Sequence, residues 1–239
     1  ADGVGIIGWA QTWSQKPLRF IMDNVTRVTF PTFSRLQDKS AELRAAIEKT
    51  LFFITALTFP IVAGMAVLAP TLINLIPNYD KWKVALIPLA IFCFNSAFAA
   101  VSTPLTNTLN ALGRVKTNTV LMMMWTVLAW GLTPGLAIKY GYIGVAYATG
   151  IIAISSVVPV IIVKRLTGFS IKSILPPLVA TLVMLAVAIF INKTWEVSTV
   201  SLVANIFISG VVYISLLLAM KGRELIDQSK RFVYALRQK

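Results

Sequence analysis

Four ionisable side chains lie inside one long apolar stretch, residues 4–33, near the start of the chain. At about 100° per residue in an α-helix, Lys16, Arg19, Asp23 and Arg27 fall on one face, within about 80° of one another. Three cations facing lipid would together cost on the order of 8–10 kcal/mol, so we expect this face to line an aqueous cavity. Because such cations attract anions, Lys16, Arg19 and Arg27 are our candidate residues for binding an anionic substrate.

Asp23 allows two interpretations. It lies four residues from both Arg19 and Arg27, the spacing at which a helix can form ion pairs, while Lys16 reaches toward an interface. Alternatively, Asp23 couples transport to protons or sodium ions, because it is the only acid in any predicted spanning segment. One carboxylate cannot neutralise all three cations, which favours the cavity.

A second group of polar side chains lies on a later apolar segment. Asn95, Ser102 and Thr106 fall within about 20° of one line on a helix. They could line the cavity and hydrogen-bond to sugar hydroxyls, or they could hydrogen-bond between helices. Neither interpretation is favoured strongly by spacing alone.

The elements that would position these residues are membrane-spanning helices. A bilayer core about 30 Å thick takes roughly 20 apolar residues in a helix. Six further stretches approach this length without any Asp, Glu, Lys or Arg. The sequence therefore predicts an all-α, polytopic bundle of about seven spans, namely residues 4–33, 50–69, 84–110, 117–138, 142–163, 174–191 and 198–220. Glycines near the fourth and fifth spans are expected to mark close helix packing, namely Gly131, Gly135, Gly141, Gly144 and Gly150.

The distribution of Lys and Arg predicts the orientation. Fifteen of the 22 lie in alternate loops and in residues 221–239, whereas four lie in the intervening loops. By the positive-inside rule, the carboxyl terminus is cytoplasmic. Residues 221–239 are expected to form a basic amphipathic tail on the anionic inner leaflet. Residues 38–49 have mixed charge and good helix formers, which predicts a short helix at the cytoplasmic surface.

Composition excludes several functional classes. The chain is 57% hydrophobic and 13% charged, with no histidine and one cysteine. Its cations lie between apolar runs, which excludes a nucleic-acid partner. No metal site, no cofactor and no catalytic residue is expected, because metal-ligand clusters and the Walker A, GxSxG and HExxH motifs are absent from the sequence. Because the chain opens at Ala1 in place of methionine, we interpret it as a piece of a longer protein.

Residues 30–38 read FPTFSRLQD and are followed by a charged helical stretch, a proline-containing span and an NYDKW loop. In this order the segments resemble the polysaccharide flippases of the multidrug/oligosaccharidyl-lipid/polysaccharide exporter superfamily. This is the branch of Wzx-type exporters of O-antigen, colanic acid and teichuronic acid. Gly113 and Arg114, after the third span, are a weaker part of the resemblance.

The resemblance implies a second, carboxyl-terminal lobe of a flippase with 12 to 14 helices, whose amino-terminal lobe is missing here. It implies transport of undecaprenyl-diphosphate-linked oligosaccharide across the bacterial cytoplasmic (inner) membrane, for lipopolysaccharide, O-antigen or exopolysaccharide biosynthesis. The expected partners are that lipid-linked oligosaccharide, membrane lipids and the missing lobe. The alternatives are a drug or metabolite antiporter or a peptidoglycan lipid flippase of the same superfamily, or a membrane-embedded polysaccharide polymerase or ligase.

Overall fold

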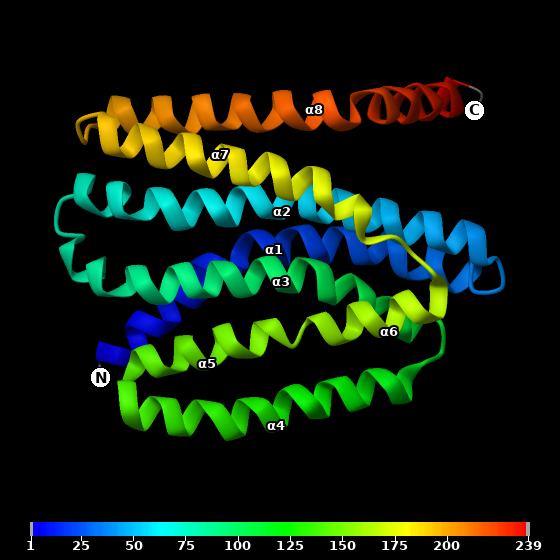
Figure 1. Ribbon diagram of the computed structural model, residues 1–239, viewed down its shortest axis with the longest axis horizontal. Helices are drawn as coiled ribbons and strands as arrows, with labels where there is room; N and C mark the ends of the chain where they lie inside the picture. The colour runs from blue at the N-terminus through cyan, green and yellow to red at the C-terminus, as the bar shows by residue number, and fades with distance from the viewer. Residues whose placement is uncertain (1, 238–239) are drawn as a thin grey trace.

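Long apolar segments favour helices in a membrane, because lipid offers no hydrogen-bond partners. In a helix the backbone amides and carbonyls pair within their own segment. The computed structural model describes the backbone of residues 2–237 and the side chains of residues 3–222. Residues 2–237 contain helices and no strand, which confirms the predicted all-α bundle (Figure 1). In chain order the helices are α1 (Asp2–Arg35), α2 (Ser40–Leu75), η1 (Asp80–Ala85), α3 (Leu86–Ala111), α4 (Val115–Tyr140), α5 (Tyr142–Ile154), α6 (Val157–Thr167), η2 (Ile171–Ile174), α7 (Leu175–Thr194) and α8 (Thr199–Arg237).

Six of the helical segments are long and apolar enough to cross a membrane. They correspond to the six charge-free stretches of the sequence, with α5 and α6 together forming one of them. The remaining predicted span is α1, which is 34 residues long and carries the four ionisable residues. The chain is therefore a multi-pass membrane protein, as expected.

The short surface helix expected at residues 38–49 does not exist as a separate element. The connection after α1 is only residues 36–39, and residues 40–49 are the first turns of α2. No glycine or proline lies between Ser40 and Thr50, so the helix continues from the charged segment into the apolar one. One side of these turns is packed rather than solvated, since Leu43 and Ile47 are buried.

The fifth predicted span is a broken helix. The α-helical pattern stops at Ser155 and Ser156, whose amides bond three residues back, to the carbonyls of Ile152 and Ala153. Pro159 has no amide to offer the Ser155 carbonyl, which prevents a regular helix from continuing through the break. The Ser155 carbonyl accepts the Val158 amide at 2.9 Å, and the Ser155 hydroxyl accepts a 2.9 Å hydrogen bond from the indole of Trp125 on α4.

A single glycine turns the chain between α4 and α5. Gly141 has φ 62° and ψ −145°, a conformation that other residues rarely adopt. Three residues later Gly144 lies against the backbone of α4, where an added Cβ would overlap the Leu136 carbonyl. By contrast, a Cβ on Gly131 or Gly135 would meet no atom within 4 Å, so the GxxxG pair does not pack in this part of the chain.

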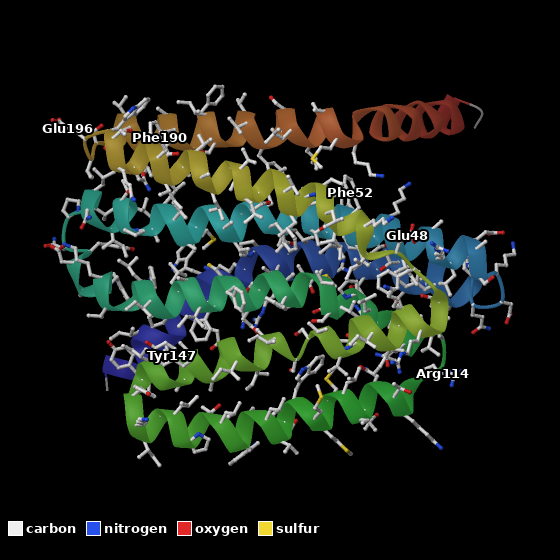
Figure 2. All side chains as sticks on the ribbon, viewed as in Figure 1. Glu48, Phe52, Arg114, Tyr147, Phe190 and Glu196 are labelled. Carbon is white, nitrogen blue, oxygen red and sulfur yellow. The ribbon has the colours of Figure 1, made fainter. Side chains whose placement is uncertain are left out.

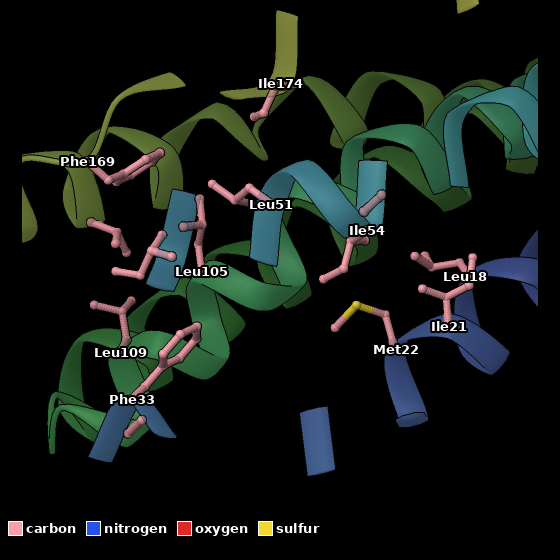
Figure 3. Packing of buried hydrophobic residues seen from close by; sticks show 14 of the residues in the cluster. Leu18, Ile21, Met22, Phe33, Leu51, Ile54, Leu105, Leu109, Phe169 and Ile174 are labelled. Atoms are coloured by element: carbon pink, nitrogen blue, oxygen red, sulfur yellow. The ribbon is translucent and has the colours of Figure 1, made fainter. Parts of the chain in front are cut away.

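The main core lies where α1, α2 and α3 meet (Figure 3). Leu51, Leu105 and Leu109 are fully buried there, as is Phe169 from the connection between α6 and α7. That connection is also held by Glu48 on α2, whose carboxylate accepts a 2.7 Å hydrogen bond from the Ser170 amide. Packing and this partly buried hydrogen bond therefore anchor a loop that has no long helix of its own.

A polar network joins α7, α8 and α2 inside the bundle. Asn205 on α8 is fully buried and donates to the Ala188 carbonyl and to the side chain of Asn192 on α7. Asn192 in turn donates to the Val67 carbonyl on α2 at 3.3 Å, and Ser209 donates to Asn205. These bonds satisfy side chains that would otherwise lie unpaired in an apolar environment.

The two ends of the bundle differ in charge. Figure 2 shows Arg114 at one end and Glu196 at the other. The end with Arg114 also contains the loop of residues 36–39 and the connection between α6 and α7, both of which belong to the Lys- and Arg-rich set. The side chains of the expected amphipathic tail, Arg223–Lys239, lie outside the described side chains.

Candidate functional site

Helix α1 has one packed face and one open face. It packs against α2 and α3 through Leu18, Ile21 and Met22, which are all buried. In Figure 1 it lies behind α2 and α3, on one side of the layer that they form. The side chains on its opposite face, away from this core, are exposed in the described part of the chain.

The open face carries the predicted stripe. Lys16, Arg19, Asp23 and Arg27 are all exposed. The structure therefore brings these four residues onto one accessible surface, as helical periodicity predicted. Arg19 and Arg27 lie eight residues apart, so the stripe extends over roughly 12 Å between them at 1.5 Å per residue.

Two of the cations have uncharged partners. The Lys16 ammonium lies 4.3 Å from the centre of the Trp13 ring, in a cation–π contact. The Arg19 guanidinium donates a 2.8 Å hydrogen bond to the side-chain oxygen of Gln15. Within the described side chains, Asp23 forms no ion pair with either arginine.

An aromatic cluster at the amino-terminal end of the stripe was not predicted. Trp9 stacks on Trp82 of η1, with ring centres 4.8 Å apart and planes 19° apart. Trp13 packs against Trp9 at 6.4 Å and is 44% exposed. Trp9 and Trp13 are four residues apart and face the same side of a helix, but nothing in the sequence indicates that Trp82 meets them.

An apolar groove borders this cluster. It has a volume of about 570 Å³ and lies between α1, α2, α7 and α8. Trp9 and Trp13 form part of its wall, so Trp13 contacts both the groove and Lys16. A surface that places cations beside an apolar groove suits an amphiphilic anion. Other lining residues include Leu68, Leu72, Met184, Leu202 and Ile206.

The polar residues predicted on the third span lie mostly inside the bundle. Ser102 and Thr106 are each 5% exposed, and the Thr106 hydroxyl donates to the Thr103 carbonyl of its own helix. Asn95 is half-buried. These three residues do not join the stripe on α1.

Two other polar residues of α3 form hydrogen bonds with α1. The Ser96 hydroxyl donates a 3.0 Å hydrogen bond to the Ser14 carbonyl, and Asn107 donates to the Thr26 hydroxyl at 3.2 Å. Helical angles could have placed Ser96 and Asn107 on the same side of α3, but the partner helix could not be known. These bonds fix the rotation of α1, and hence the direction of its open face.

Comparison with known proteins agrees with this architecture. Residues 1–87 match the family model described as polysaccharide biosynthesis protein. The match covers α1, α2 and η1, which include the cationic stripe and the aromatic cluster.

Two known bacterial proteins match the chain in part. One is the uncharacterized membrane protein in the cps region of Klebsiella pneumoniae, 29% identical over 92 residues, or 38% of this chain and 19% of that protein. The other is the lipopolysaccharide biosynthesis protein WzxC of Escherichia coli (strain K12), 30% identical over 91 residues, or 38% of this chain and 18% of that protein. Each match thus spans less than a fifth of the relative.

A solved structure shares the fold over almost the whole chain. The structure of the lipid II flippase MurJ in an inward closed conformation superposes with a TM-score of 0.77 and 19% identity. The superposition covers 94% of this chain and 48% of that protein. This chain therefore has the fold of about half of that flippase.

Proposed function

We propose that the complete protein is a flippase, and not an enzyme, that moves undecaprenyl-diphosphate-linked oligosaccharide to the periplasmic leaflet of the bacterial inner membrane. The cargo would serve lipopolysaccharide, O-antigen or exopolysaccharide biosynthesis. The observation that carries the proposal is the row of Lys16, Arg19 and Arg27 on the open face of α1, which meets an apolar groove at its Lys16 end through Trp13. A lipid-linked diphosphate has the matching parts, an anion and an apolar chain.

The charge of the stripe determines what can cover it. Lipid against the three cations would cost about 2.5–3.5 kcal/mol for each one at mid-membrane. A second lobe facing α1 would instead enclose them in a water-filled cavity, whose low-dielectric walls focus the field of the cations on a diphosphate. We therefore propose that the cavity is completed by an amino-terminal lobe, with the carboxyl terminus in the cytoplasm.

Transport would follow by alternating access, in which two lobes rock around a central site. The stripe runs along the axis of α1 rather than around it, so the headgroup can remain close to a cation while the cavity opening changes sides. This arrangement suits an anion that must cross the membrane with its sugar attached.

The competing functions fit less well. An antiporter for cationic drugs would favour acidic side chains in its cavity, whereas the open face of α1 presents three cations and one acid. A polymerase or ligase would be expected to have a large outward loop, but the outward connections described are only Ile76–Ala85, Gly141 and Trp195–Ser198. Relatedness in fold to a lipid II flippase keeps peptidoglycan lipid as a second candidate cargo.

The test is transport by the complete protein in liposomes. Two fluorescent substrates are compared, an undecaprenyl-diphosphate-linked oligosaccharide and lipid II, each with its headgroup accessible to a quencher on one side. We expect headgroup translocation well above protein-free liposomes for the oligosaccharide, with a smaller rate for lipid II. If neither substrate is translocated, the proposal is contradicted. A preference for lipid II would assign the cargo to peptidoglycan synthesis.

A further inference from the structure

We propose that Trp13 and Gln15 are positioning residues, which hold Lys16 and Arg19 by uncharged groups so that both cations keep their charge for an anionic headgroup. This inference rests on the proposed function and adds two residues to its site. It also explains how a cluster of like charges is kept oriented on a face that has one carboxylate.

Trp13 orients Lys16 without neutralising it. The ammonium lies 4.3 Å from the ring centre, where the negative face of the indole attracts it. An aromatic ring carries no net charge, so the attraction for a distant anion is largely retained. Trp13 is itself supported by Trp9, which stacks on Trp82 of η1, so the ring that holds Lys16 is fixed from outside α1.

Gln15 does the same for Arg19. Its amide oxygen accepts one N–H of the guanidinium at 2.8 Å. A guanidinium has five N–H donors, so four remain for a ligand. A neutral acceptor restricts the arginine rotamer and leaves its charge intact, which reduces the ordering that substrate binding must otherwise bring about.

Some cations elsewhere in the described chain are paired with carboxylates. The three ion pairs among residues 3–222 join Lys39 to Glu42, Arg44 to Glu48 and Lys83 to Asp80. All three lie at the ends of the bundle, near the loops. On the stripe, Asp23 stands four residues from both Arg19 and Arg27 and pairs with neither. Lys81 and Lys139, near the loops, also lie over aromatic rings, 5.7 Å and 5.3 Å from the ring centres of Trp82 and Tyr140. The stripe differs from the three ion pairs in that the described partners of Lys16 and Arg19 are an indole and an amide and not a carboxylate.

The test separates charge from geometry at position 15. Gln15→Glu keeps an acceptor for Arg19 but adds a negative charge, whereas Gln15→Ala removes the acceptor and adds none. Gln11→Glu is the matched control, because Gln11 is exposed on the same helix but lies eight residues, or about 12 Å along the axis, from Arg19. Trp13→Ala and Trp13→Phe compare loss of the ring with a smaller ring, and Trp130→Ala is the control for loss of an exposed tryptophan.

Affinity is measured on the complete protein in nanodiscs, with farnesyl diphosphate, farnesyl monophosphate and farnesol as probes. We expect Gln15→Glu to weaken farnesyl diphosphate binding by about tenfold or more, and Gln15→Ala by roughly two- to fivefold. Trp13→Ala should weaken it several-fold and Trp13→Phe less, because phenylalanine still offers a ring face. Farnesol affinity should stay unchanged in all the Gln15 variants, which a merely structural defect would not allow.

The outcomes distinguish this inference from the proposed function. If the wild-type protein does not prefer farnesyl diphosphate to farnesol, the proposed function fails and the inference with it. If it does, but Gln15→Glu binds as well as Gln15→Ala or Gln11→Glu, the inference is wrong and the proposed function stands. If the Trp13→Ala variant does not accumulate in the membrane, the comparison of the Gln15 variants still tests the inference.

Discussion

The hydroxyl of Tyr213 on α8 donates a 2.7 Å hydrogen bond to the carbonyl oxygen of Ala56 on α2. In a regular helix that carbonyl would be bonded by the amide four residues later, but position 60 is a proline. A side chain from another helix thus satisfies the backbone group that Pro60 leaves free. This is a requirement of the membrane interior, where no water is present to do so.

The first prediction is a double-mutant cycle at this contact. Tyr213→Phe should lower the free energy of unfolding by about 1 kcal/mol, because the Ala56 carbonyl loses its donor. In a Pro60→Ala background the amide of residue 60 can bond to Ala56, so the same substitution should cost clearly less. Thermal unfolding of the purified protein in detergent measures both. Equal costs in the two backgrounds would show that the bond does not compensate for the proline.

The second prediction concerns the turn between α4 and α5. Gly144→Leu should sharply reduce the amount of folded protein, because its side chain cannot fit against the Leu136 backbone, and overpacking of this kind costs about 1–3 kcal/mol or more. Gly131→Leu, on the open side of α4, should be tolerated. Membrane abundance and the elution profile in size-exclusion chromatography report the difference. Similar behaviour of both variants would contradict the close approach.

The third prediction tests the arginines of the stripe. Arg19→Gln or Arg27→Gln in the complete protein should reduce surface polysaccharide by more than about tenfold, because a diphosphate loses a charged partner. Lysine at either position should retain more transport, since it keeps the point charge. Arg165→Gln, an exposed arginine at the end of α6, is the control. If both glutamine variants are present at normal abundance and produce wild-type amounts of surface polysaccharide, the stripe has a structural role and does not bind the substrate.

The fourth prediction separates the two interpretations of Asp23. Asp23→Asn should leave membrane abundance within about twofold of wild type, because Asp23 makes no ion pair within the described side chains. If Asp23 couples transport to an ion, headgroup translocation of the labelled substrate in liposomes should fall. It should also no longer respond to the proton or sodium gradient. A large loss of abundance would instead indicate an ion pair that holds the helix in the assembled protein.

The fifth prediction is the orientation in the membrane. Reporters that are active on one side only are fused at Asn192 and at Lys239. Because fifteen of the Lys and Arg residues lie in one set of loops and four in the other, we expect cytoplasmic activity at Lys239 and periplasmic activity at Asn192. Periplasmic activity at Lys239 would overturn the orientation. The Lys16 and Arg27 ends of the stripe would then lie on the opposite sides of the membrane from those proposed.

Sequence alone determined the six charge-free apolar spans and the face of α1 that carries charge. Lipid requires about 20 apolar residues per crossing, so length and composition are read directly from the chain. Helical periodicity then placed Lys16, Arg19, Asp23 and Arg27 together, because they belong to one helix and their angles depend on no other segment. A bundle of membrane-spanning helices is also what the family resemblance in residues 30–38 implies.

Only the tertiary structure decided which polar and small residues are buried. Ser102 and Thr106 lie inside the bundle, and Gly144 packs closely while Gly131 does not. The stack of Trp9 on Trp82 joins residues 73 positions apart in the chain, a relationship that no local pattern contains. Within lipid every helix is apolar on most sides, so hydrophobicity does not mark the faces that meet; close packing and hydrogen bonds between helices choose them.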